Sequence, residues 1–133
     1  MKISTAGLMV AVIAACLILA NPETARAIRP NEQLRIDMLI EAVDRDSTLI
    51  FIRNGSEHTA QEAASHLRLK LRRAGNRIST AEEFIDHLAT SSSFSKKPYM
   101  VRILEEDPKP AGPFFHQLLL KVAPPFQTSP PEE

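Results

Sequence analysis

Apolar residues recur at helical spacing in four stretches of the chain between Pro30 and Val122. Positions i, i+3, i+4 and i+7 share one face of an α-helix, so such stripes predict amphipathic helices. Two short runs between them are instead rich in β-branched and aromatic residues, which predicts strands. The predicted order is therefore α-β-α-α-β-α, with helices at 31–43, 60–74, 80–88 and 113–122 and strands at 48–54 and 99–104.

The two terminal helices have recognisable starts. Asn31 is a residue type that accepts a hydrogen bond from the first turn, so we expect it to cap the first helix. The last helix should begin near Pro113, because proline is favoured in a first helical turn. The apolar stripe of the first helix comprises Ile36, Leu39, Ile40 and Val43, widened by Leu34 and Met38.

This pattern predicts a small single α+β domain at 28–122. About 95 residues form one core that is only just large enough for stability. Two strands alone make a marginal sheet, so we expect helices to cover one of its faces. We expect an antiparallel rather than a parallel pair of strands, packed against an αα-hairpin made by the two middle helices and against the terminal helices.

The N-terminal segment indicates export. An uncharged apolar run at 3–20 follows Lys2, and Ala25-Arg26-Ala27 has the small residues that a signal peptidase requires. We therefore predict a signal peptide at 1–27, cleaved after Ala27, and a periplasmic protein. Two alternatives would attach the protein to the membrane. The apolar run could remain as an uncleaved anchor, or Cys16, which ends a lipobox-like Ile-Ala-Ala-Cys, could be lipidated to give an envelope lipoprotein.

Composition narrows the chemistry. The formal net charge is zero, which argues against a nucleic-acid partner, and export strengthens that argument. The only cysteine, Cys16, lies in the predicted signal peptide, so the processed chain has no disulfide, thiolate catalyst or cysteine-bound zinc. We expect no cofactor. Residues 123–133 include four prolines and predict a disordered tail.

One phrase occurs twice, as TAQEAASHL at 59–67 and as TAEEFIDHL at 80–88. Each copy places a glutamate four residues before a histidine, and residues four apart are neighbours on a helix. Two such pairs on packed helices could supply four nitrogen and oxygen ligands to zinc, which makes a metal-dependent hydrolase an alternative function. Its metal ligands would be Glu62, His66, Glu83 and His87.

The same phrase also has a structural interpretation. Thr59 with Glu62, and Thr80 with Glu83, have the spacing of a capping box, in which the threonine accepts from the N3 amide and the glutamate reaches back. Capping explains the threonine and the glutamate of both copies, and leaves the two histidines unexplained. We favour capping, because an antiparallel hairpin also places the start of one helix beside the end of the other.

Basic residues cluster along the helix at 60–74 and just after it. A solvated helix face explains them, since cations are favourable near a helix C-terminus. They also suggest a site that grips a carboxylate or phosphate group. Our principal hypothesis is a non-enzymatic periplasmic domain that binds an anionic ligand or an envelope partner. The residues expected to form its surface are Arg53, Asn54, His66, Arg68, Lys70, Arg77, Ser92, Lys97 and Arg102.

A longer stretch supports this class of protein. The segment at 51–103 resembles the YfeK-like family of small exported bacterial proteins, whose function has not been established. It reads FIRNGSEHTAQEAASHLRLKLRRAGNRISTAEEFIDHLATSSSFSKKPYMVRI. The resemblance runs through a predicted strand, both middle helices and the serine-rich loop. It implies a signal peptide and a single periplasmic domain, and it brings no catalytic residues with it.

Overall fold

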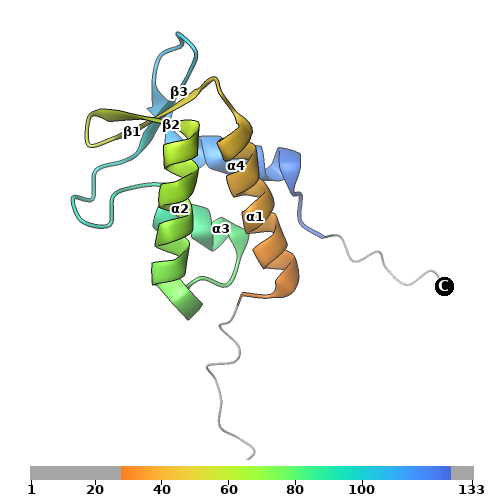
Figure 1. Ribbon diagram of the computed structural model, residues 1–133. Coiled ribbons are helices and arrows are strands. Elements are labelled where there is room, and N and C mark those ends of the chain that lie inside the picture. The colour runs from red at the N-terminus through yellow and green to blue at the C-terminus, as the bar shows by residue number, and fades with distance from the viewer. Residues whose placement is uncertain (1–27, 127–133) are drawn as a thin grey trace, which may run out of the picture.

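The structure is a computed structural model that describes residues 28–126 (Figure 1). The predicted signal peptide at 1–27, with Cys16, lies outside the described residues, and so does most of the predicted tail, at 127–133. Between residues 28 and 126, no helix is both long enough and apolar enough to cross a membrane.

Four α-helices form where apolar periodicity predicts them. They are α1 (Pro30–Arg45), α2 (Ala60–Ala74), α3 (Ala81–Phe84) and α4 (Ala111–Val122). A 3-10 turn, Gly75–Arg77, follows α2, and α3 continues into a single π-helical turn, Ile85–Ala89. The helix predicted at 80–88 is therefore α-helical only in its first part.

The start of α1 differs from our expectation. Arg29 precedes the first helical residue, Pro30, and no side chain caps the helix. Asn31 lies inside the first turn, where its side-chain oxygen accepts a hydrogen bond from the Glu32 amide at 2.9 Å. The prediction of an Asn31 cap was wrong, because proline already has a helical φ and no amide hydrogen to satisfy, so the helix begins with it.

Four strands form one antiparallel sheet in the order β2-β1-β3-β4. Their bounds are β1 (Leu49–Arg53), β2 (Ser56–Thr59), β3 (Met100–Ile103) and β4 (Lys109–Pro110). β1 and β3 are the strands predicted from the sequence, and they pair antiparallel with Phe51 opposite Val101. The α+β class and the pairing direction are confirmed. The sheet has four strands rather than two, so the order is α-β-β-α-α-β-β-α.

The two strands that we missed are polar and lie at the sheet edges. β2 reads Ser-Glu-His-Thr and β4 reads Lys-Pro, and both are largely exposed. Alternation of apolar and polar residues requires one buried face, so short exposed edge strands do not show it. The turn before β2 did carry a signal: Asn54 and Gly55 have φ of 51° and 80°, as the Asn-Gly turn of a β-hairpin requires.

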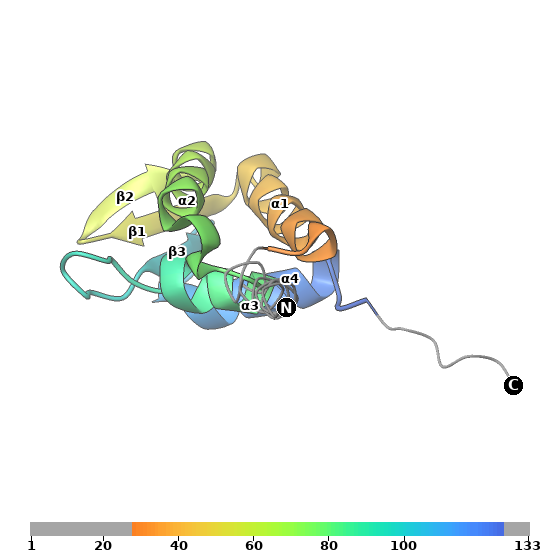
Figure 2. The same ribbon diagram turned by 90° about the horizontal axis from the view of Figure 1, so that it is seen from below.

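The helices and the sheet enclose one core. α1 and α2 lie side by side in both views, with α3 and α4 across one face of that pair (Figures 1 and 2). The main helical neighbour of α2 is thus α1, and not the shorter helix that follows it along the chain. We expected α2 to pack mainly against the next helix in an αα-hairpin, and that contact is smaller than the contact between α2 and α1.

Aromatic residues occupy the centre of the core. The Phe51 ring of β1 lies 4.9 Å from the Tyr99 ring and 6.4 Å from the Phe115 ring, measured between centroids. The four stripe positions of α1 are all buried, as predicted. Leu34 and Met38, expected to widen that stripe, are instead 50 % and 41 % exposed. The buried face of α1 is therefore narrower than its apolar pattern.

Candidate functional site

The first copy of the repeated phrase is a complete capping box. The Glu62 amide donates to the Thr59 hydroxyl oxygen at 3.2 Å, and the Thr59 amide donates to the Glu62 carboxylate at 2.8 Å. Two amides at the start of α2 are satisfied reciprocally. The capping interpretation of this copy is confirmed.

The second copy forms only half of a capping box. The Glu83 amide donates to the Thr80 hydroxyl oxygen at 3.1 Å, as predicted. The Glu83 carboxylate, however, accepts from both the amide and the hydroxyl of Ser79, each at 2.8 Å. These hydrogen bonds, the backbone one first, hold the pKa of Glu83 below its usual value. The glutamate reaches one residue further back than a capping box requires.

The four proposed metal ligands are not brought together. Glu62 and Glu83 each turn back to the backbone at the start of their own helix. Across residues 28–126, no group of three or more histidine, cysteine, aspartate or glutamate side chains is placed to hold a metal ion. Glu62, His66, Glu83 and His87, the predicted metal ligands, therefore form no metal-binding group among the described residues, because each glutamate carboxylate is engaged by a backbone amide at its own helix start.

A cavity of about 710 Å³ opens beside the C-terminal half of α2. Its walls come from α2 and the turn after it, from Arg53 at the end of β1, from the end of the second copy of the phrase, and from the loop before β3. The lining residues are Arg53, His66, Lys70, Arg73, Ala74, Arg77, Ile78, His87, Leu88, Ser92, Ser93, Phe94 and Tyr99. Four are cations and two are histidines, and no aspartate or glutamate is among them.

Lys70 is the most enclosed of these cations, with 9 % of its surface exposed. Its ammonium donates to the Tyr99 hydroxyl oxygen at 3.1 Å and to the Ser91 carbonyl at 3.2 Å. The Tyr99 hydroxyl oxygen lies 3.5 Å from Nε2 of His66, and Nη1 of Arg53 lies 3.2 Å from the same nitrogen. Lys70, Tyr99, His66 and Arg53 therefore form one chain of polar contacts along the cavity wall.

The pKa values along this chain of contacts reflect burial first and neighbouring positive charge second. Burial, and then the nearby Arg53 guanidinium, lower the pKa of Lys70 to about 8. Burial, followed by Arg53 and Lys70, also lowers the pKa of His66. Burial raises the pKa of Tyr99. Each shift disfavours the charged form of the residue, as expected where water is excluded and no opposite charge replaces it.

The loop before β3 is held in a defined shape. Ser92 is 7 % exposed, and its hydroxyl oxygen accepts from the amides of Phe94 and Ser95, both at 3.3 Å. The Ser95 hydroxyl donates to the Asn54 side-chain oxygen at 2.8 Å, which ties the loop to the β1–β2 turn. Phe94 stands at this loop with its side chain 100 % exposed, and it lines the cavity.

Comparison with known proteins identifies the family. A family model described as a family of unknown function, DUF5329, matches residues 30–123. The chain belongs to this family. It is 47 % identical over 83 residues to the uncharacterised protein YfeK of Salmonella typhimurium strain LT2, a match that covers 62 % of this chain and 68 % of that protein. No solved structure matches. The resemblance to the YfeK-like family is confirmed, and the family has no established function.

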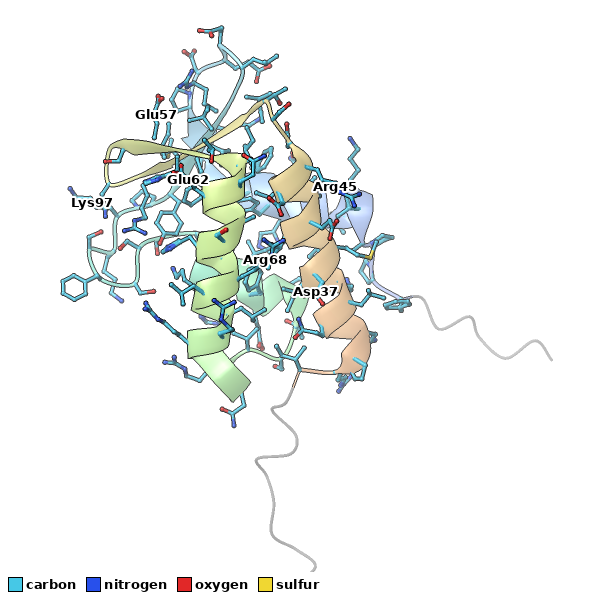
Figure 3. All side chains as sticks on the ribbon, in the orientation of Figure 1. Asp37, Arg45, Glu57, Glu62, Arg68 and Lys97 are labelled. Carbon is cyan, nitrogen blue, oxygen red and sulfur yellow. The ribbon has the colours of Figure 1, made fainter. Side chains whose placement is uncertain are left out.

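Five of the nine residues predicted for the binding surface line the cavity: Arg53, His66, Lys70, Arg77 and Ser92. The other four do not. Arg68 lies 3.1 Å from the Asp44 carboxylate, and Arg102 lies 2.6 Å from that of Glu57. Figure 3 shows Arg68 on the side of α2 that faces α1, and Lys97 on the opposite side of α2. Asn54 supports the loop before β3 rather than facing the cavity.

For the binding surface, sequence reasoning did not single out Arg73, Phe94 or Tyr99, which also line the cavity. A signal for Arg73 was present, because His66, Lys70, Arg73 and Arg77 are spaced by four, three and four residues. This is the spacing of one helix face, so they form a polar stripe beside the apolar one. No comparable pattern points to Phe94, whose place depends on the folding of the loop.

Proposed function

We propose that this protein is a non-enzymatic binding domain of the cell envelope that holds an anionic group in the cavity beside α2. The observation that carries the proposal is the charge of the lining: Arg53, Lys70, Arg73 and Arg77 with no carboxylate. The predicted signal peptide supports the envelope as the compartment. The anionic group would be a phosphate or a carboxylate, the partners that guanidinium and ammonium groups bind best.

Several cations outside the cavity already have a carboxylate partner. Arg35, Arg45, Arg68 and Arg102 each lie within 3.1 Å of a carboxylate. Within the described residues, none of the four cavity cations has such a partner. Of these four, Lys70 is the one that is buried, and a buried charge without an opposite charge is costly. An anion in the cavity would lower that cost for Lys70, and this favours binding.

Binding fits the cavity better than catalysis does. The serine of the lining that is buried, Ser92, uses its hydroxyl oxygen to accept from two loop amides. A nucleophile needs a neighbouring base instead, within about 3 Å. The metal-dependent alternative lacks a group of converging ligands among residues 28–126.

The test is a phosphate titration of the purified full chain, followed by NMR chemical shifts. Lys70→Gln and Arg68→Gln each remove one positive charge from α2, inside and outside the cavity respectively. Lys70→Gln should weaken phosphate affinity about tenfold, which corresponds to about 1.4 kcal/mol. Arg68→Gln should change it less than twofold, because Arg68 is already paired with Asp44.

A second cavity variant protects the test against misfolding. Arg73→Gln alters an exposed side chain of the lining, and it should also weaken phosphate binding while the spectrum stays that of the folded protein. Acetate in place of phosphate distinguishes the two anion chemistries. Equal effects of Lys70→Gln and Arg68→Gln, or no binding of either anion, would overturn the proposal.

A further inference from the structure

The cavity is much larger than a simple anion. Pockets of roughly 300–1,000 Å³ typically enclose a drug-sized organic ligand, and this cavity has a volume of about 710 Å³. An inorganic phosphate or a carboxylate alone would leave most of that space to water. The size of the cavity therefore points to a ligand with a substantial body attached to its charged group.

The cavity lining contains apolar as well as cationic side chains. Beside the cations stand four apolar side chains, Ala74, Ile78, Leu88 and Phe94. Ile78 is 2 % exposed and Ala74 is 5 % exposed, so both belong to the core as well as to the cavity wall. A ligand that fills the cavity thus meets positive charge on one part of its surface and apolar groups on another.

Phe94 is the most informative of these residues. Its side chain is 100 % exposed, so it contributes nothing to the core. The backbone that carries it is nevertheless held in place, because the Phe94 amide donates to Ser92 and the next residue is tied to Asn54. Exposed aromatic rings at the edge of a concave site are typical of ligand contact, since burial of a phenylalanine side chain is strongly favourable.

We propose that the ligand is an organic anion, with one phosphate or carboxylate group carried on an apolar body that packs against Phe94. This inference rests on the proposed function, because the cations of the cavity hold the charged group. It adds the class of ligand: an amphiphilic anion of drug size, with either an aromatic or an acyl body.

The experiment compares three phosphates on the same full chain: inorganic phosphate, 1-naphthyl phosphate and octyl phosphate. All three present a phosphate to the cations, and only the last two bring an apolar body. At least one organic phosphate should bind about tenfold more tightly than inorganic phosphate. The ratio between naphthyl and octyl phosphate identifies the body as aromatic or acyl, and either result supports the proposal.

Two variants locate the apolar contact. Phe94→Ala should weaken the preferred organic phosphate by about five- to tenfold and leave inorganic phosphate unchanged. Phe126→Ala is the matched control, because Phe126 is 60 % exposed and lies outside the cavity lining, so neither affinity should change. Both variants remove an exposed ring, so loss of folding is not expected from either.

The failures of the two proposals are distinguishable. If all three phosphates bind with equal affinity, and Phe94→Ala changes nothing, the inference about the ligand class is overturned while the anion site stands. If no phosphate binds, and no carboxylate binds in the acetate titration, the anion site itself is overturned.

Discussion

Arg35 and Lys70 are the two cationic residues buried in the described part of the chain, and their surroundings are opposite. Arg35, on α1, donates to the carboxylates of Glu32 and Glu82 and to the Ala123 carbonyl, at 2.7 to 3.3 Å. Lys70, on α2, has only the uncharged partners Tyr99 and Ser91.

The pKa values of the two residues follow this difference. The hydrogen bonds to Glu82 raise the pKa of Arg35 despite its burial, whereas burial and Arg53 lower the pKa of Lys70 to about 8. A buried cation with its carboxylates in place is a structural clamp, here joining α1 to the start of α3 and to the end of α4. Lys70 has no carboxylate beside it, and we propose that the anionic ligand supplies the opposite charge.

The largest expected effect lies at Arg35. Arg35→Met should lower the free energy of unfolding by about 3 kcal/mol, because it leaves two carboxylates and one carbonyl without their partner. For a domain of this size the melting midpoint should fall by roughly 15 °C, which circular dichroism would detect. Arg45→Ala is the control: its pair with Glu41 is highly exposed and should contribute less than about 0.5 kcal/mol.

If Arg35→Met has the same melting midpoint as the unaltered protein, the ion pairs of Arg35 do not stabilise the fold. The structural role that we assign to Arg35, in contrast to Lys70, would then be wrong. Phosphate affinity of the folded variant should be unchanged, since Arg35 does not line the cavity. A parallel loss of phosphate binding by the folded protein would contradict the separation of the two regions.

The next effect is a rise in stability with pH caused by Lys70. Its pKa is about 8 in the folded protein and 10.5 in its ordinary state, so the unfolded chain binds more protons between these values. The free energy of unfolding should therefore increase, by about 1–3 kcal/mol, as pH rises from 8 toward 10. Urea denaturation at pH 7.5 and 9.5 measures the increase, and Lys70→Gln should remove most of it.

Tyr99 does not obscure this window, because its raised pKa acts in the opposite direction only above about pH 10. An equal alkaline rise in Lys70→Gln and in the unaltered protein would mean that Lys70 carries no unpaired buried charge. The role that we propose for Lys70, as a buried cation that awaits an anionic ligand, would then be wrong.

The smallest expected effect is a loss of stability at acidic pH, caused by protonation of Glu82. Hydrogen bonding to Arg35 lowers the pKa of Glu82 below 4.5, so its contribution is present above pH 4.5 and is lost as pH falls through the folded-state pKa. The Glu82 side chain is 43 % exposed, which limits the contribution to below about 1 kcal/mol. Glu82→Gln should flatten the acid part of the stability curve while leaving the alkaline rise of Lys70 intact.

Regular elements with a buried face were predictable. The stripes of α1, α2 and α4 and the strands β1 and β3 follow from periodicity, because one face of each packs on the core. The Thr59 box was predictable for a different reason: capping involves residues three apart, and needs no information from the rest of the chain. The Asn31 cap failed where two local signals competed and the proline prevailed.

The candidate site was predictable only in part. Arg68 and Lys70 lie two residues apart on α2, and the sequence presented both as members of one basic cluster. Two residues apart, side chains point to different sides of a helix. Which side meets a carboxylate depends on how α1 packs beside α2, and that places Asp44 next to Arg68 and leaves Lys70 without a carboxylate.

The sequence by itself determined the helices and strands that bury a face, the helix start at Thr59, and membership of a family without an established function. Periodicity and capping act between near neighbours, so the chain records them directly. Only the tertiary structure decided which cations are paired, that the two Glu-His pairs form no metal-binding group among residues 28–126, and that Phe94 and Lys70 line the same cavity. These outcomes depend on residues distant along the chain, and no local pattern specifies them.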